Sequence, residues 1–164
     1  MIAFLIGMGI PAIFIFATEL FNDKIQSRFD IEKYTQTPIL GEVGHSYGEN
    51  TLVIGRNSRS MVAEQFRIIR TNLQYFLNKK DRFTILVSST FSGEGKSFSS
   101  TNVAAAHALA GKKTILLEFD IRKPKVIAGL GMEKGPGITN FLVGKVTDLS
   151  QVIRPVPEIE NLFV

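Results

Sequence analysis

The sequence predicts an α/β fold in which a parallel sheet is flanked by helices. Two short apolar segments with a high content of strand-forming residues, 83–88 and 113–118, lie on either side of an alanine-rich segment, 97–110. A strand, a helix and a second strand of these lengths form a unit whose two strands run parallel. A glycine-containing loop connects the first of these strands to the helix.

The chain begins with an apolar segment, residues 1–18, which contains no charged side chain. This segment is nearly long enough to cross a bilayer as a helix, and membrane helices tolerate a proline such as Pro11. Lys24, Arg28 and Lys33 follow it, which by the positive-inside rule places the rest of the chain in the cytoplasm. We expect a transmembrane helix over residues 1–18. A buried core helix is the alternative, and a cleaved signal peptide fits less well because no cationic residue precedes the apolar run.

The next part of the chain is expected to connect this helix to a soluble domain. Residues 19–34 are predicted to form a polar helix, which ends before Pro38 because the residue preceding a proline avoids the helical region. Residues 39–43 are predicted to form a short strand, and residues 44–60, rich in Gly, Asn and Ser, a linker. The expected organisation is therefore a transmembrane helix over 1–18, a juxtamembrane helix and linker over 19–58, and an α/β domain over 59–164.

A further helix is predicted from about residue 60 to residue 77. Its apolar residues recur at steps of three and four and form one stripe: Val62, Phe66, Ile69, Leu73 and Phe76. Glu64, Arg67 and Arg70 lie off this stripe, three residues apart, where neighbouring side chains meet. The basic residues between Arg56 and Arg82 suit an anionic partner or, equally, a solvated helix face.

The loop between the first strand and the alanine-rich helix reads Ser-Thr-Phe-Ser-Gly-Glu-Gly-Lys-Ser over residues 89–97. Gly93 and Gly95 allow the backbone N–H groups to point at a phosphate, which the N-terminus of the following helix also favours. The ammonium of Lys96 would reach the β- and γ-phosphates, and the hydroxyl of Ser97 would bind Mg²⁺. Thr90 stands where the full Walker A pattern has its first glycine. We expect ATP and Mg²⁺ to bind here, with these residues in contact: Ser92, Gly93, Glu94, Gly95, Lys96, Ser97 and Phe98.

Two carboxylates, Glu118 and Asp120, follow the second strand of this unit. Ligands of open α/β sheets bind at the carboxyl ends of the strands, and alternation places both side chains on the same side. They are expected to hold Mg²⁺, and one of them to accept the proton of an attacking hydroxyl. The alternative is a strand end that becomes polar where it meets water, with Arg122 paired to one of the acids. The chain has no cysteine, which excludes disulfides, thiolate chemistry and cysteine-bound zinc.

Three segments together, 64–73, 89–97 and 117–124, resemble the bacterial tyrosine kinases of capsule and exopolysaccharide export. Residues 21–32 and 37–43 are similar to the stretch after the second transmembrane helix of the chain-length-determinant part, so the resemblance covers nearly all of the chain. It implies an incomplete P-loop NTPase sheet in a tyrosine autokinase of the bacterial inner membrane, with the residues after about 19 in the cytoplasm. Residues 137–144 resemble the short helix that follows the acidic strand in this family.

The resemblance also assigns roles to residues. Lys96, Glu118 and Asp120 match catalytic positions, and Ser97, Glu118 and Asp120 match the magnesium site. Glu64, Arg67 and Arg70 match the helix motif through which such kinases associate into rings. The implied partners are further copies of the chain, the polysaccharide export machinery, the membrane and protein tyrosines, including its own; no nucleic acid is expected.

The sequence departs from the family pattern in three places. Glu118 stands where the family usually has Asp, and Phe91 stands where partition ATPases of the same superfamily have a lysine, which argues against those ATPases. No later apolar strand ends in Asp and the tyrosines form no cluster, so we expect an internal fragment that is inactive alone. The alternative function is a non-catalytic nucleotide-binding assembly protein that sets polysaccharide chain length. A partition-type ATPase is a third and weaker possibility.

Overall fold

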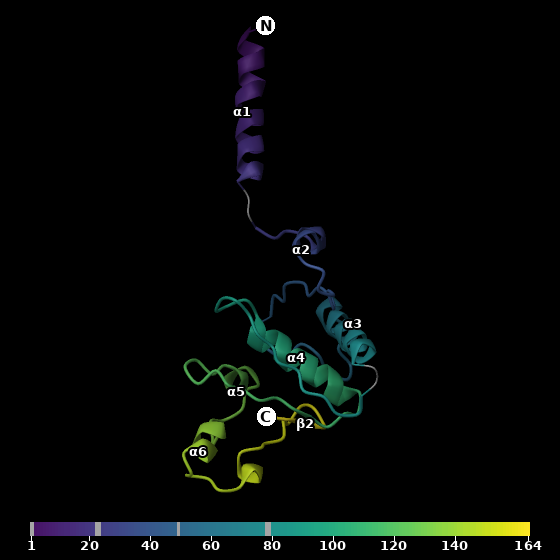
Figure 1. Ribbon diagram of the computed structural model, residues 1–164, viewed down its shortest axis with the longest axis vertical. Helices are drawn as coiled ribbons and strands as arrows, with labels where there is room; N and C mark the ends of the chain where they lie inside the picture. The colour runs from purple at the N-terminus through teal and green to yellow at the C-terminus, as the bar shows by residue number, and fades with distance from the viewer. Residues whose placement is uncertain (1, 22–23, 49, 78–79) are drawn as a thin grey trace. The chain divides into compact units, whose positions relative to one another are not determined.

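The computed structural model describes residues 2–21, 24–48, 50–77 and 80–164. The chain divides into two units, Met1–Pro38 and Ile39–Val164. Each unit is described by itself (Figure 1).

The first unit begins with helix α1, Ile2–Leu20, over the segment predicted to cross a membrane. Pro11 lies inside this helix, and the side chains of residues 13–16 are exposed. Within the described part of the chain, no helix reaches the length and apolar character that a membrane crossing requires. The transmembrane assignment of residues 1–18 stays a prediction.

Helix α2, Arg28–Tyr34, is the second helix of this unit. The prediction of one polar helix over residues 19–34 is wrong, because α1 ends at Leu20 and α2 begins only at Arg28. The carboxylate of Asp30 accepts hydrogen bonds from the N–H groups of Gln26 (3.0 Å) and Ser27 (2.9 Å). An acidic side chain that takes up backbone N–H groups in this way starts a new helix at that point.

The second unit has its core between helix α3, Met61–Phe76, and helix α4, Lys96–Leu109, which pack side by side (Figure 1). Phe66 of the predicted stripe is fully buried, and its ring meets that of Phe98 edge to face at 5.6 Å. Phe76, at the end of the stripe, is half exposed. The buried face of α4 consists largely of alanines, whose small side chains let the two helices approach closely.

The sheet of the second unit is small. Strand β1, Thr114–Ile115, pairs in parallel with strand β2, Leu162–Phe163, and a bridge joins Phe163 to Pro155 in antiparallel fashion. The two strands are linked by hydrogen bonds such as that from the N–H of Leu116 to the carbonyl of Phe163 (2.8 Å). The predicted segment 113–118 thus contributes a strand that is shorter than expected.

The prediction that residues 83–88 pair in this sheet is wrong for the structure described. These residues form no hydrogen-bonded strand, and the side chain of Leu86 is 91% exposed. A groove of about 1,010 Å³ lies between residues 81–87 and residues 112–120. Adjacent strands of a ladder lie about 4.8 Å apart, and these two segments form no such ladder.

Residues 44–60 are predicted to be a linker, but the segment before α3 packs against the rest of its unit, and the strand predicted over residues 39–43 does not form. The division between the units falls after Pro38, so this whole segment belongs to the same unit as α4. Ile54 is only 2% exposed and lies in the core. Apolar burial of this kind holds a segment in place even where it has no regular secondary structure.

Three short helices follow β1: α5, Val126–Gly129; α6, Ile138–Leu142; and the 3₁₀ helix η1, Leu149–Gln151. Helix α6 lies within residues 137–144, where the family resemblance implies a short helix, so that expectation is confirmed. The last residue of α5, Gly129, packs closely against Thr51: a Cβ at this position would lie 2.4 Å from the Oγ1 of Thr51. Helix α4 is thus packed against elements that precede it in the sequence and against elements that follow it.

Candidate functional site

The predicted phosphate-binding loop leads directly into α4. Gly93 (φ +98°) and Gly95 (φ +83°) both adopt the left-handed backbone conformation that side chains disfavour. Gly95 is the N-cap of α4 and has no side chain to cap the helix. The first bond back to it comes from the N–H of Ser99 (2.8 Å), so the three N–H groups before Ser99 have no intrahelical acceptor. Such a helix start is well suited to bind an anion.

Two side-chain contacts fix the shape of this loop. The carboxylate of Glu94 accepts a hydrogen bond from the N–H of Phe91 (3.1 Å), and the hydroxyl of Ser89 donates one to the carbonyl of Phe91 (3.0 Å). Both contacts are internal to the loop, so Glu94 shapes the loop. The Phe98 side chain packs against Phe66, which leaves only its backbone N–H for a nucleotide.

The structure brings together four of the predicted site residues. Lys96 and Ser97 from the start of α4, and Glu118 and Asp120 from the segment after β1, all line the groove of about 1,010 Å³. The other predicted nucleotide contacts do not line it: Ser92, Gly93, Glu94, Gly95 and Phe98. The roles assigned to these residues stay predictions, but the two motifs, more than twenty residues apart in sequence, meet at one surface.

The two carboxylates differ in their local contacts. Glu118 accepts hydrogen bonds at both oxygens, from the N–H groups of Lys125 (2.7 Å) and Val126 (3.1 and 3.2 Å), and so caps α5. Asp120 accepts one bond, at Oδ1, from the N–H of Lys123 (3.1 Å). Of the two, Asp120 is therefore the carboxylate with an oxygen available to bind a metal ion or a substrate proton.

The oxygen-bearing side chains that line the groove fit a magnesium–nucleotide complex. The hydroxyl of Ser97 and the carboxylates of Asp120 and Glu118 are oxygen ligands, which Mg²⁺ prefers. No group of three acidic, histidine or cysteine side chains that could hold a metal is found in the described ranges. Mg²⁺ is commonly bound by one or two carboxylates together with water and substrate phosphates, so such a group is not needed.

His107 also lines the groove, at the other end of α4. Its ring meets Phe83 edge to face at 5.3 Å, and neither ring nitrogen has a hydrogen-bond partner in the described part of the chain. Burial lowers the pKa of His107, and the charges of Arg70 and Lys112 lower it further. The imidazole is therefore neutral at pH 7 and packs as part of the groove wall.

Asn102 has a structural role that the sequence analysis did not predict. It is fully buried on α4, and its Oδ1 accepts hydrogen bonds from the N–H groups of Val53 (2.9 Å) and Ile54 (3.3 Å). Its Nδ2 donates to the carbonyls of Thr51 (2.7 Å) and Phe98 (2.9 Å). A single asparagine within an alanine-rich helix is the sequence signal that would have indicated such a role.

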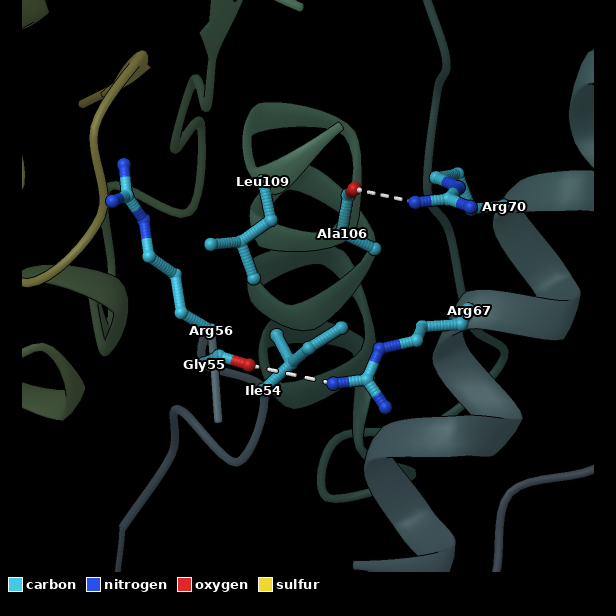
Figure 2. A pocket seen from close by; sticks show the side chains of 7 residues that line it. All are labelled: Ile54, Gly55, Arg56, Arg67, Arg70, Ala106 and Leu109. Atoms are coloured by element: carbon cyan, nitrogen blue, oxygen red, sulfur yellow. Dashed lines mark hydrogen bonds between the residues drawn. The ribbon is translucent and has the colours of Figure 1, made fainter. Parts of the chain in front are cut away.

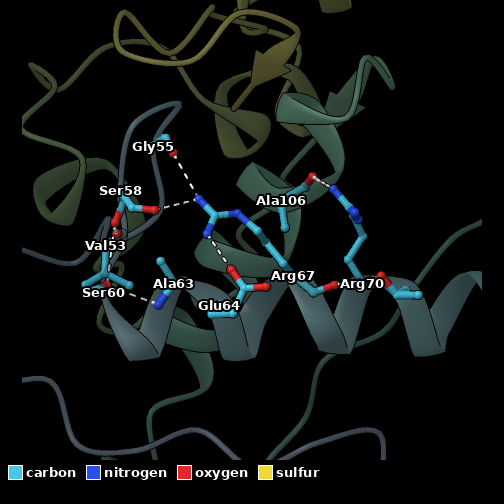
Figure 3. A network of polar contacts seen from close by, with 10 residues as sticks. Val53, Gly55, Ser58, Ser60, Ala63, Glu64, Arg67, Arg70 and Ala106 are labelled. Atoms are coloured by element: carbon cyan, nitrogen blue, oxygen red, sulfur yellow. Dashed lines mark hydrogen bonds and ion pairs between the residues drawn. The ribbon is translucent and has the colours of Figure 1, made fainter.

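The two arginines of the predicted association motif are partly buried, whereas its glutamate, Glu64, is exposed. Arg67 and Arg70 border a small pocket between α3 and α4 (Figure 2). Arg67 pairs with Glu64 (2.8 Å) and donates to the carbonyls of Ser58 (2.8 Å) and Gly55 (3.4 Å), as Figure 3 shows. Arg70 donates to the carbonyl of Ala106 at 3.4 Å (Figure 3). Arg67 and Arg70 therefore connect α3 to its own neighbours, and the role of the motif in ring formation stays a prediction.

Comparison with known proteins gives relatives of one kind, although no protein-family model matches the chain. The tyrosine-protein kinase YwqD of Bacillus subtilis is 36% identical over 96 residues, which are 58% of this chain and 40% of that protein. The putative tyrosine-protein kinase CapB of Staphylococcus aureus is 32% identical over 113 residues, 69% of this chain and 49% of that protein. The chain thus spans about half, or less, of the length of these relatives.

Solved structures agree with this result. The crystal structure of the chimerical protein CapA2B2 matches with a TM-score of 0.74 at 28% identity, over 84% of this chain and 58% of that one. The BceF tyrosine kinase domain matches with a TM-score of 0.71 at 22% identity, over 85% of this chain and 60% of that one, a likeness that concerns the fold alone. The α/β fold predicted from the sequence is therefore confirmed. By sequence and by fold, the chain matches part of the bacterial tyrosine kinases, and its resemblance to that family is confirmed.

Proposed function

We propose that the chain carries the ATP-binding part of a membrane-anchored tyrosine autokinase that regulates polysaccharide polymerisation and export. The observation that carries this proposal is the single groove lined by Lys96 and Ser97 on one side and by Glu118 and Asp120 on the other. The relatives named tyrosine-protein kinases support the reaction class.

The reaction is the in-line transfer of the γ-phosphoryl group of ATP to a tyrosine hydroxyl. The tyrosine oxygen forms a bond to the γ-phosphorus, the bond from that phosphorus to the bridging oxygen breaks, and ADP leaves. The ammonium of Lys96 and the unpaired N–H groups of the first turn of α4 bind the phosphates and offset their charge. Ser97 and Asp120 would hold Mg²⁺ here, and the ion would supply further charge neutralisation.

Asp120 is the better candidate for the group that receives the tyrosine proton. Its Oδ2 accepts no hydrogen bond from the described residues, whereas both oxygens of Glu118 accept backbone N–H groups at the start of α5. Glu118 would then act mainly by holding the 123–126 turn beside the site.

The anchoring and assembly parts of the proposal rest on the rest of the chain. Residues 1–18 have no charged side chain and α1 extends over residues 2–18, which supports insertion in the bacterial inner membrane with the second unit in the cytoplasm. Ring formation through Glu64, Arg67 and Arg70, and action on the chain's own tyrosines and on the export machinery, rest on the family resemblance.

The test uses the full-length gene product with Mg·ATP and detects phosphotyrosine by antibody and by mass spectrometry. We expect a signal that disappears in Lys96→Met and in Asp120→Asn, and that is unchanged in Lys134→Met, a control that removes an exposed charge elsewhere. Glu118→Gln is expected to retain part of the signal, because an amide oxygen still accepts the N–H groups of α5.

The rival function is a non-catalytic assembly protein for which the nucleotide is a structural ligand. The contacts of Glu118 with the start of α5 favour this rival, because they leave only one of the two carboxylates available for catalysis. Nucleotide binding without phosphotyrosine, in the native protein as in the variants, would establish the rival and refute the kinase.

A further inference from the structure

The pocket between α3 and α4 is a second polar site, separate from the nucleotide groove. It has a volume of about 200 Å³ and is lined by these residues: Ile54, Gly55, Arg56, Arg67, Arg70, Ala106 and Leu109. None of them lines the groove that holds Lys96 and Asp120. The volume lies below the roughly 300–1,000 Å³ of pockets for drug-sized ligands, so the pocket suits a small ion or a single functional group.

Three arginines from two segments of the chain border this pocket (Figure 2). Arg56 comes from the segment before α3, and Arg67 and Arg70 come from successive turns of α3. Arg56 pairs with Glu160 and Arg67 pairs with Glu64, so two of the three charges are balanced. The pair of Arg56 with Glu160 is largely exposed and therefore weak enough to be exchanged for another anion.

Arg70 is the unbalanced group. It forms no ion pair with the described residues, and its Nη1 reaches the carbonyl of Ala106 only at 3.4 Å. Its Nε is buried and has no hydrogen-bond partner in the described part of the chain. A buried donor of a charged group without an acceptor is costly, and an anion in the pocket would remove this cost.

We propose that this pocket binds a phosphate group, either as the free ion or as a phosphate monoester such as phosphotyrosine. A phosphate monoester offers three acceptor oxygens to the arginines that line the pocket, whereas a carboxylate offers two. Gly55 and Ala106, with little or no side chain, leave the space that the group needs. Arginine is the residue most suited to this contact, because its planar fork binds two oxygens at once.

The test measures the affinity of the chain for inorganic phosphate and for phenyl phosphate by calorimetry, at constant ionic strength. A Lys96→Met background reduces the contribution of the phosphate-binding loop. We expect saturable binding that is weakened at least about tenfold by Arg70→Gln, the loss typical of one hydrogen bond to a charged group. Arg59→Gln is the matched control: Arg59 is exposed one residue before α3's N-cap, and its loss should leave the affinity unchanged.

The two ligands distinguish the sources. Tighter binding of inorganic phosphate assigns the free ion, and tighter binding of phenyl phosphate assigns a phosphate monoester. Equal affinities in Arg70→Gln and Arg59→Gln, or acetate that binds as tightly as phosphate, would overturn the proposal. If Arg70→Gln does not fold, Arg56→Gln takes its place, because the exposed side chain of Arg56 contributes little to the fold.

Discussion

Replacing Asn102 by leucine tests the contact that fixes the segment before α3 to the helix of the phosphate-binding loop. Leucine has the same number of side-chain heavy atoms and the same branching as asparagine and suits a helix, so the change removes the hydrogen bonds without leaving a cavity at this fully buried position. It leaves the N–H groups of Val53 and Ile54 and the carbonyl of Thr51 without their partner on α4.

The expected loss of stability follows from the burial of these three groups. Ile54 is 2% exposed, so its N–H cannot regain a bond to water, at a cost of about 1–3 kcal/mol. Val53 and Thr51 are half-buried and recover part of their hydration, so together they add about 1 kcal/mol. We expect Asn102→Leu to lower the free energy of unfolding by about 2–4 kcal/mol.

Urea denaturation followed by circular dichroism measures this loss, and hydrogen exchange of the amides of Val53 and Ile54 locates it. Asn57→Leu is the control, because Asn57 is exposed in the same segment and its replacement should change stability by less than about 0.5 kcal/mol. A loss for Asn102→Leu no larger than for the control, with both amides still protected, would refute the reasoning.

Three further predictions concern the loop, the groove wall and the packing of α5. Gly95→Ala, at φ +83°, should strain the loop by about 1–2 kcal/mol and so weaken nucleotide binding about tenfold in an ADP titration. Gly111→Ala, at φ +81° but outside the loop, is the control: it should cost similar stability and leave nucleotide affinity unchanged. Burial holds the pKa of His107 below its usual value, so the unfolded chain binds more protons as the pH falls below about 6.5; stability should therefore decline from pH 7 to pH 5, and His107→Gln should flatten that decline in denaturation curves. Gly129→Ala would place a Cβ 2.4 Å from the Oγ1 of Thr51 and should cost about 1–3 kcal/mol in thermal unfolding. Most of that cost should disappear in the double variant with Thr51→Gly, and a cost that persists would contradict this packing.

The features that the sequence determined are local ones. Helix α3 follows from the spacing of its apolar residues, and α4 from an alanine-rich run that starts at Gly95 and ends near Gly111. The loop conformation at Gly93 and Gly95 was likewise predictable, because the type of residue restricts the backbone angle. Each of these features depends on interactions within a few residues, which a single sequence displays directly.

The tertiary structure alone decided the features that depend on distant contacts. The sequence could not show that Ile54 is buried or that Asn102 binds the segment before α3, because the partners lie almost fifty residues apart. The apolar run 83–88 reads as a strand, yet a strand forms only where a neighbour accepts its hydrogen bonds, and here a groove lies in that place. The arginine pocket shows the same limit. Its three arginines are recognisable in the sequence as basic residues, but only the packing of α3, α4 and the segment before α3 brings them to one cavity and leaves Nε of Arg70 without an acceptor among the described residues.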